Sequence, residues 1–351
     1  MQRYTKIIKS PNFFAKIANY LGFRSVIRTF VPSMKTIYLD QLTECLAPCV
    51  ATIGFFDGVH LGHRYLIDKV VERAHYEGLM STVVTFARHP RQVLSPDWHP
   101  QLISTFEEKV ALLSQTDIDQ LVVLDFDASM AALSAYDFMH DVLLLKLGVK
   151  ALVTGYDNHF GHRQTGSTEG FDDYVGYGRD MGMTVLQGDS FDVEDIRVSS
   201  SKVRRLLAAG DVEMAARCLG RPYRLTGTVV SGEHIGTGLG YPTANLMPSD
   251  KYKLIPAAGV YAVRARVGDS PKWKSGMMNI GNRPTFGGDH LTLETHLFRF
   301  EDNIYGQPMT VSFVSRLRFE LRFDSREALM EQLSLDARQA ERILNEMTEI
   351  Q

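Results

Sequence analysis

Thr52-Ile-Gly-Phe-Phe-Asp-Gly-Val-His-Leu-Gly-His63 is the stretch that decides the fold of the first half of the chain. It continues an apolar, strand-like run at residues 49–56 and leads into residues 66–74, where apolar side chains recur at helical spacing. Gly54 and Gly58 let the backbone approach a ligand closely, and the first N–H groups of a helix favour phosphate. The stretch therefore predicts a strand, a phosphate-binding loop and a helix in succession.

His60 and His63 stand three residues apart at the start of that predicted helix. On a helical first turn they share one face, so both imidazoles can donate hydrogen bonds to one α-phosphate. A transfer between phosphate groups needs little more than positioning and charge stabilisation, because the incoming phosphate is already the nucleophile. Taken alone, the pair is equally consistent with capping or core histidines, or with half of a metal site.

Apolar, strand-like runs alternate with helical patterns from residue 49 to residue 188. The runs cover residues 49–56, 81–86, 120–126, 151–155 and 183–187. Ser104 followed by Glu107 predicts a capping box that opens a second helix, and residues 137–147 predict another. This alternation predicts an α/β domain with a doubly wound parallel sheet, in which ligands bind beyond the carboxyl ends of the strands.

The sequence becomes rich in β-type runs after Arg221-Pro222-Tyr223. These runs cover residues 225–230, 259–267, 274–280, 291–300 and 309–317, and a long helix is predicted over 326–347. Short strands punctuated by Gly and Pro predict a small antiparallel β-barrel followed by a terminal helix. We therefore expect domains at residues 34–220 and 221–351, preceded by an extension at residues 1–33.

Length and composition limit the classes of protein that this chain can be. With 351 residues, 44% of them hydrophobic and 23% charged, it is long enough for two globular domains. A net charge of -3 gives no indication of nucleic acid or membrane binding, and the sequence contains no apolar stretch long enough to span a membrane. Three cysteines fit a reducing cytoplasm, although Cys45 and Cys49 leave half of a metal site as an alternative.

Residues 1–33 contain six basic residues and no Asp or Glu, so the rest of the chain carries a net charge of -9. A basic start without acidic residues is typical of a transit peptide or a surface helix. It lacks a clean apolar core and a small-residue cleavage site. We favour the interpretation that the protein starts at Met34, directly before a strand-like segment.

The whole string G-x-F-D-G-x-H-x-G-H after a strand resembles the HxGH motif of the nucleotidylyltransferase superfamily, and within it the prokaryotic FMN adenylyltransferases. Three further segments resemble that family in the same order. They are Thr85-Phe-Ala-Arg-His-Pro90, Gly155-Tyr-Asp-Asn-His-Phe-Gly161 and Ser199-Ser-Ser-Lys-Val-Arg204. Serines at a helix start supply caps and hydroxyl donors, and Arg204 can reach a phosphate one turn in.

The resemblance implies roles for individual residues of the first domain. It implies ATP contacts at Gly54, Phe56, Asp57, His60, His63, Ser201 and Arg204, with the two histidines catalytic. It implies flavin or substrate contacts at Asp157, Asn158 and Arg163, and it places Asp57 at the mouth of the site, near magnesium or substrate. Asn158 stands where many relatives carry Phe, and Ser201 stands where many carry Thr but keeps the hydroxyl.

A second set of motifs lies in the predicted barrel. Gly236-Thr-Gly-Leu-Gly-Tyr-Pro-Thr-Ala-Asn245 is glycine-rich but lacks the G-K-[ST] of a Walker loop. It resembles the PTAN motif of riboflavin kinases, which implies that Gly238 and Gly240 bind ATP and that Thr243 and Asn245 coordinate Mg-ATP. Hydroxyl and amide oxygens are suitable magnesium ligands. Thr237 stands where relatives often carry Arg.

Residues 291–297 alternate like a half-buried strand, with Thr292, Glu294 and His296 on one face. The resemblance implies that Glu294 is the general base, and the turn Asn303-Ile-Tyr-Gly306 that follows also matches the family. A carboxylate that deprotonates the ribityl 5′-hydroxyl is what phosphoryl transfer to an alcohol requires. Without the resemblance, Glu294 would be interpreted as a solvated strand carboxylate.

Both motif sets occur in the order shown by bifunctional riboflavin kinase/FMN adenylyltransferases. The resemblance implies that riboflavin and ATP give FMN and ADP, and that FMN and ATP then give FAD and diphosphate, with Mg²⁺ as cofactor. It implies a cytoplasmic enzyme whose partners are small molecules, with no nucleic acid, membrane or obligate protein partner. The alternatives are that one domain alone is active, that the protein binds flavin without catalysis, or that the first domain uses another acceptor.

Overall fold

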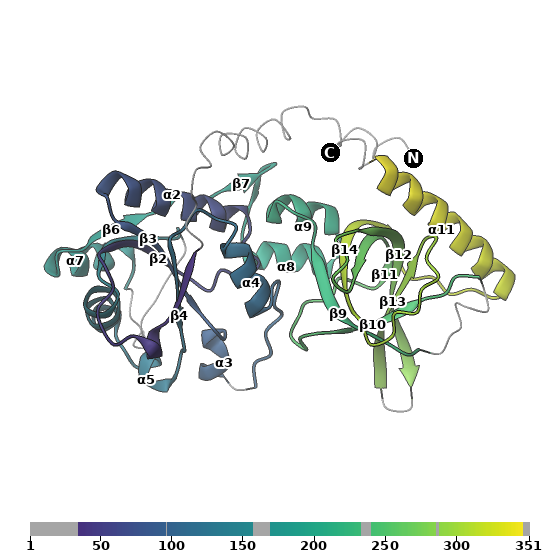
Figure 1. The fold of residues 1–351 in the computed structure, drawn as a ribbon, viewed down its shortest axis with the longest axis horizontal. Helices are drawn as coiled ribbons and strands as arrows, with labels where there is room; N and C mark the ends of the chain where they lie inside the picture. The colour runs from purple at the N-terminus through teal and green to yellow at the C-terminus, as the bar shows by residue number, and fades with distance from the viewer. Residues whose placement is uncertain (1–33, 96, 157–168, 233–239, 286–287, 347–351) are drawn as a thin grey trace.

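The computed structural model describes residues 34–95, 97–156, 169–232, 240–285 and 288–346, with side chains outside 282–290 (Figure 1). Within them, a six-stranded parallel sheet and a closed six-stranded barrel lie side by side. No helix of this described part is long and apolar enough to cross a membrane. The predicted combination of a parallel α/β sheet and a small barrel with a terminal helix is confirmed.

The parallel sheet is buried on both faces. Its strands, in spatial order, are β1 (Lys35–Tyr38), β4 (Gln120–Leu124), β3 (Met80–Phe86), β2 (Cys49–Ile53), β5 (Val149–Thr154) and β6 (Thr184–Gln187). Successive residues of one strand enter opposite cores: Val83 packs in one apolar cluster and Val84 in the other. This is why the strands are continuous apolar runs.

Helices cover the two faces of the sheet. The longer ones are α2 (Leu61–Glu77), α4 (Phe106–Leu113), the π-helix η2 (Phe138–Lys146) and α7 (Phe171–Asp180), whereas α8 (Ser200–Ala208) and α9 (Val212–Leu219) pack with the barrel. The shorter elements are η1 (Leu39–Gln41), α3 (Pro90–Leu94), α5 (Ala128–Ala131), α6 (Ala135–Asp137), and the pair β7 (Asp192–Val193) and β8 (Ile196–Arg197). Residues of α2 share a core with one face, whereas residues of η2 and α7 share a core with the other.

The capping box predicted at Ser104 and Glu107 is wrong by one residue. Thr105 caps α4, its hydroxyl accepts from the Glu108 N–H at 3.2 Å, and the Glu108 carboxylate accepts from the Thr105 N–H at 3.0 Å. Ser104 cannot serve because its hydroxyl and its N–H are bonded to the buried Asp57. A tertiary contact therefore decides where this helix begins.

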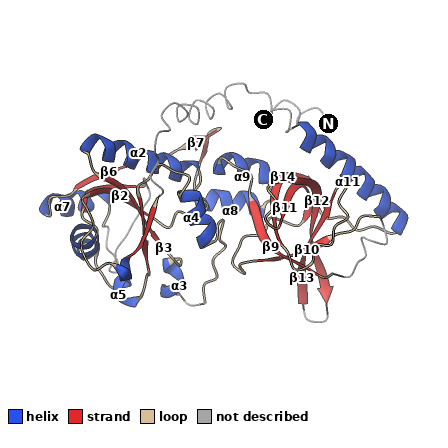
Figure 2. Ribbon diagram, in the orientation of Figure 1, coloured by secondary structure: helices blue, strands red, loops and turns tan. Residues whose placement is uncertain are grey.

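The barrel closes in the order β10-β13-β12-β11-β14-β9, with antiparallel pairing throughout. Its strands are β9 (Arg224–Val230), β10 (Ala244–Pro248), β11 (Gly259–Val267), β12 (Lys274–Thr285), β13 (Gly288–Leu297) and β14 (Pro308–Arg318). The terminal helix α11 (Arg326–Glu346) packs through Ala340 and Leu344 on Ala262 and Met277. Figure 2 shows this half as strands with α11 along its outer side.

Helices α8 and α9 lie between the sheet and the barrel in Figure 1. One apolar cluster contains Leu207 of α8, Ala215 of α9 and Phe313 of the barrel, so the core continues across residue 220. A second contact lies at Leu102, which forms a parallel bridge with Lys253 of the loop between β10 and β11. The domain limits 34–220 and 221–351 stay a prediction.

Candidate active sites

The loop between β2 and α2 has an unusual backbone. Phe56, Gly58 and Val59 all have positive φ angles, of 53°, 78° and 37°. Residues other than glycine adopt this region at a cost of about 1–3 kcal/mol each, and they keep it only where the surroundings hold them there. Such strain is typical of sites where the chain must present side chains in one geometry.

The two histidines stack at the end of this loop. His60 caps α2, and its Nδ1 accepts a hydrogen bond from the His63 N–H at 3.2 Å. The two ring centroids are 3.6 Å apart and the rings are 16° from parallel. The prediction that both side chains share one face is therefore confirmed.

Both imidazoles are neutral at pH 7. Burial, followed by the positive charges of Arg221 and Arg204, lowers the pKa of His60 to about 3. Burial, followed by His60 and Lys109, lowers the pKa of His63 well below its usual value. The buried Nδ1 of His63 has no hydrogen-bond partner within the described part of the chain. Each ring can therefore offer a phosphate a neutral N–H donor.

Asp57 is buried beside the histidine loop, and the ATP contact expected of it stays a prediction. The residue is 2% exposed. Its carboxylate accepts from the N–H groups of Ile103 and Ser104, each at 3.0 Å, and from the Arg204 guanidinium at 2.6 Å. Its buried negative charge is thus fully engaged in holding the 103–104 segment and Arg204 beside the histidine loop.

The three serines at the start of α8, residues 199–201, have different environments. The Ser199 side chain caps the helix, and the Ser200 hydroxyl donates to the carbonyl oxygen of Asp57 at 3.0 Å. Ser201 is exposed on the first turn. Arg204 donates to the Gln101 carbonyl at 2.8 Å in addition to its pair with Asp57. The structure thus brings the start of α8 against the histidine loop.

Lys109 of α4 is a buried cation that sequence reasoning missed. Its Nζ donates to the carbonyl oxygens of Phe55 and Phe86, at 3.1 and 2.8 Å, and it lies 4.1 Å from the Phe55 ring centroid. It thereby joins the carboxyl ends of β2 and β3, and burial lowers its pKa to about 7. The sequence could have indicated it, because a lysine stands among the apolar positions of α4.

His89, from the Thr85–Pro90 motif, caps α3 and packs edge-on against Phe55.

Several predicted residues lie outside the described part of the chain. Asp157, Asn158 and Arg163 of the first domain belong to this group, as does Gly238 of the barrel. Gly240 is described, with a φ of 81°. Gly54 is described as well, and its Cα faces the Phe56 ring.

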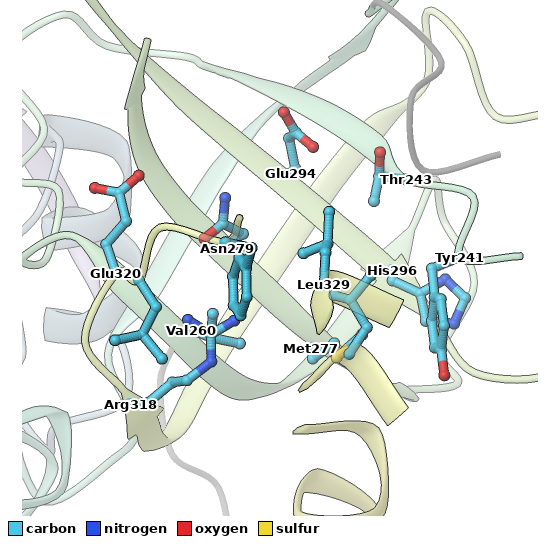
Figure 3. Close-up of a pocket in the computed structure, with 13 residues that line it drawn as sticks. Tyr241, Thr243, Val260, Met277, Asn279, Glu294, His296, Arg318, Glu320 and Leu329 are labelled. Carbon is cyan, nitrogen blue, oxygen red and sulfur yellow. The ribbon is translucent and has the colours of Figure 1, made fainter. Parts of the chain in front are cut away.

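The barrel contains a cavity of about 230 Å³ between its strands and α11 (Figure 3). Apolar side chains from α11 and the strands cover one part of it, and Glu294 and Thr243 lie together at one end. The lining residues include Tyr241, Val260, Met277, Phe323, Leu329 and Leu333. Arg318 and Glu320 line the cavity on another side, away from Thr243 (Figure 3). A concave site with apolar walls and a few polar groups is typical of a site for a small organic ligand.

Three oxygen-bearing side chains stand in one row across the barrel wall. Glu294 of β13 is the register partner of Asn245 on β10 and of Asn279 on β12, so all three point to the same face. The backbone of Gly232 approaches this row closely, and an added Cβ at position 232 would lie 2.0 Å from the Asn245 amide nitrogen. Asn279 lines the same cavity as Glu294, and Figure 3 shows the two near each other. Sequence reasoning predicted Asn245 and Glu294 individually, whereas it included Asn279 only in the 277–286 stretch, which the resemblance expects to cover the flavin or nucleotide.

A second cavity, of about 290 Å³, lies on the other side of Thr243. It is lined by Thr295 of β13 and by the 300–305 loop, which includes Asn303 and Tyr305. The Thr295 hydroxyl is buried without a hydrogen-bond partner among the described residues. Glu294 faces the first cavity and Thr295 the second, which confirms the predicted alternation of this strand. Thr243 lines both cavities.

Comparisons with known proteins match these two halves separately. Residues 42–202 match the family model of FAD synthetase, and residues 219–344 match that of riboflavin kinase. A Pseudomonas fluorescens protein named "Bifunctional riboflavin kinase/FMN adenylyltransferase" is 39% identical over 289 residues, which cover 82% of this chain and 90% of that protein. A Haemophilus influenzae protein of the same name is 34% identical, over 88% of this chain and 98% of that one.

A solved structure shares the arrangement of the chain. It is described as "Crystal Structure of Macrolide-efflux Protein from Streptococcus pneumoniae", is 30% identical, and has a TM-score of 0.76 over 86% of this chain and 97% of that one. Those words describe the Streptococcus protein, and the similarity to this chain extends across both halves. With the two family matches and the two full-length relatives, it follows that the chain belongs to the family of bifunctional riboflavin kinase/FMN adenylyltransferases.

Proposed function

We propose that this chain phosphorylates riboflavin to FMN in the barrel and adenylylates FMN to FAD beside His60 and His63, with ATP as co-substrate of both steps. The observation that carries the proposal is the presence of two separate sites, each in the half that matches the corresponding family. The barrel site has a carboxylate in one of two neighbouring cavities, and the loop site has paired neutral imidazoles beside a helix N-terminus.

In the barrel we assign the flavin to the cavity of Figure 3 and the nucleotide to the cavity on the other side of Thr243. Leu329, Leu333 and Met277 give the first cavity the apolar surface that an isoalloxazine ring needs. The ribityl 5′-hydroxyl then reaches Glu294, which accepts its proton as the oxygen attacks the γ-phosphorus of ATP. The bond to the γ-phosphorus breaks on the ADP side, so the products are FMN and ADP.

The oxygen atoms around Glu294 fit a magnesium ion. Thr243 offers a hydroxyl and Asn245 an amide carbonyl, and both are hard donors of the kind that Mg²⁺ prefers. Gly232 supports this fit, because any larger residue would displace the Asn245 amide. Bound there, the ion would neutralise the charge of the ATP phosphates. Thr243 and Asn245 would hold it at the boundary of the two cavities, where the phosphates must lie.

At the loop site, His60 and His63 donate hydrogen bonds to the α-phosphate of ATP as negative charge develops there. An oxygen of the FMN phosphate attacks the α-phosphorus and diphosphate leaves, which gives FAD. We assign the remaining ATP contacts to Gly54, Phe56, Ser201 and Arg204, and the flavin contacts to Asp157, Asn158 and Arg163. We also place the protein in the cytoplasm, because none of its three cysteines is in a disulfide.

Chromatography of the flavins formed from riboflavin, ATP and magnesium tests both assignments in one chain. Glu294→Gln keeps the shape of the side chain but removes the base, so FMN formation should fall by about 10²–10⁴-fold. The same variant supplied with FMN should make FAD at the wild-type rate. His63→Gln should convert riboflavin to FMN normally and slow the formation of FAD by about 10²-fold or more.

Three other results would contradict the proposal. Wild-type protein that stops at FMN would mean that the loop site is inactive or uses another acceptor. Wild-type protein that binds riboflavin without converting it would indicate a non-catalytic flavin-binding protein. Equal loss of both steps in Glu294→Gln would mean that the two activities do not belong to two separate sites.

A further inference from the structure

Arg221 lies where the chain passes from α9 to β9, and its side chain contacts the histidine loop rather than the barrel. Its guanidinium donates to the carbonyl oxygen of Gly58 at 2.5 Å and to that of Val59 at 3.2 Å. It also donates to the Leu219 carbonyl at 3.0 Å. Two successive peptide groups of the loop are therefore held by one planar, fork-shaped side chain.

Backbone hydrogen bonds on both sides of Arg221 fix the direction of its side chain. Gly220 ends α9 in the left-handed conformation, with a φ of 70°, and the Arg221 N–H bonds back to the Ala216 carbonyl at 3.1 Å. Two residues later, the Tyr223 carbonyl accepts from the Phe313 N–H of β14 at 2.9 Å. The backbone of Arg221 is thus held between the C-terminal end of α9 and strand β14 of the barrel.

Gly220 itself packs directly on the helix that His60 begins. A Cβ at position 220 would lie 2.6 Å from the Leu61 side chain, so this close approach is available to glycine alone. Leu61 belongs to the apolar cluster that α8, α9 and the barrel share. The contact between residues 220–221 and the loop therefore has an apolar part and a hydrogen-bonded part.

The two held peptide groups lie on either side of Val59, which is the strained residue between them. Gly58 and Val59 both have positive φ, and the β-branched Val59 is the residue directly before His60. His60 in turn accepts from the His63 N–H and stacks on the His63 ring. A change in the Val59 conformation would rotate His60 away from this cap position and would separate the two rings.

We infer that Arg221 is a positioning residue for adenylyl transfer: by holding the carbonyl oxygens of Gly58 and Val59, it fixes the loop conformation that stacks His60 and His63. The inference rests on the adenylyl transfer proposed above for this loop. It means that the first residues of the barrel half complete the site of the other half. Lysine cannot replace this function fully, because an ammonium group does not match two carbonyl oxygens in the fixed geometry of a guanidinium.

The test uses the full chain, in which riboflavin phosphorylation reports on folding in the same sample. We expect Arg221→Lys to lower kcat for FAD formation from FMN by about 10-fold and Arg221→Ala by about 100-fold. KM and kcat for riboflavin phosphorylation should stay within about twofold. Added guanidinium at millimolar concentration should restore part of the adenylylation by Arg221→Ala, because it can occupy the vacated position between the carbonyl oxygens.

Arg217→Met is the matched control. Arg217 lies one turn earlier on α9 and donates to the Glu194 carboxylate at 2.7 and 2.9 Å. Its replacement should leave both activities within about twofold of wild type.

Two results would overturn the inference. Either both activities of the Arg221 variants fall in proportion, without rescue by guanidinium, or adenylylation is unchanged. If Arg221→Ala does not fold, the test rests on Arg221→Lys. The inference then requires that its kcat for FAD formation fall relative to its kcat for riboflavin phosphorylation. Failure of the proposed function is distinguishable, since wild-type protein would then make no FAD.

Discussion

His60 is neutral in the folded protein, and this gives stability a defined dependence on pH. Its pKa is lowered to about 3, whereas an unfolded chain restores the ordinary value of about 6.5. Between these two values the unfolded state binds one more proton than the folded state, so acidification lowers the free energy of unfolding by about 1.4 kcal/mol per pH unit. His60→Asn keeps a capping side chain and removes this titration.

We therefore expect a shallower pH dependence in His60→Asn. Urea unfolding at steps between about pH 4 and 6 should give a slope smaller than wild type by about 1.4 kcal/mol per pH unit. Equal slopes would mean that His60 binds a proton in the folded protein as readily as in the unfolded chain.

Single residues differ in how far their surroundings follow from sequence. The contact between His60 and His63 follows from a spacing of three, and the direction of Glu294 follows from strand alternation. The burial of Asp57 does not, because the donors that surround it are Ile103 and Ser104, from a loop far along the chain. Local patterns carry no information about such pairings.

At the scale of elements, Gly227 sets how closely β9 and β10 pair. A Cβ at this position would lie 2.1 Å from the Met247 carbonyl oxygen of β10. Gly227→Ala should therefore push β10 outward, together with Thr243 just before it and Asn245 within it. We expect riboflavin phosphorylation to fall by at least about 10-fold and the free energy of unfolding by about 1–3 kcal/mol, with FAD formation from FMN far less affected.

Gly176→Ala provides the control for a glycine replacement. It lies in α7, and among the described residues no atom outside its chain neighbours and its own helix backbone lies within 4 Å of an added Cβ. Alanine there should raise the free energy of unfolding by about 0.5–1 kcal/mol, with both activities unchanged. Full kinase activity in Gly227→Ala would show that the spacing of β9 and β10 does not position Thr243 and Asn245.

Most elements could be predicted from periodicity, and two of the exceptions have identifiable physical causes. The strand at 259–267 was predicted with its observed ends, and β5 was predicted to begin two residues late and to end one residue late. Strand β10 was missed because its five residues begin two positions after Pro242 and end at Pro248, so no alternation is visible. The start of α4 was misplaced because Ser104 donates its hydrogen bonds to Asp57 and does not cap the helix. Where tertiary contacts or proline interrupt a pattern, the local sequence no longer determines the element.

At the scale of the whole molecule, the sequence indicates two folds but not how they join. The apolar faces of α8 and α9 could cover the parallel sheet equally well by their spacing alone. In the structure, Val203, Leu207 and Leu219 share a core with barrel residues such as Tyr261 and Val311. Contacts of this kind depend on both partners being folded, and no short sequence window contains both.

The ion pair between Lys253 of the barrel and Glu108 of α4 allows the energetic coupling between the two halves to be measured. Their side chains are 3% and 26% exposed, and Lys253 also donates to the Ile103 carbonyl at 2.8 Å. Glu108→Gln keeps an acceptor for the Thr105 N–H but leaves a buried ammonium without its counter-charge. The free energy of unfolding should fall by about 3 kcal/mol, whereas the double variant with Lys253→Met should regain at least about 1 kcal/mol of that loss.

Denaturant unfolding of wild type, both single variants and the double variant gives the coupling between the two halves. Recovery in the double variant would mean that the penalty comes from the unpaired ammonium, and so that the pair is formed across the junction in solution. Because Glu108 also caps α4, and the preceding segment is bonded to Asp57, that coupling would reach the histidine loop. Additive losses would instead mean that the barrel stabilises the sheet half only through the apolar contacts of α8 and α9.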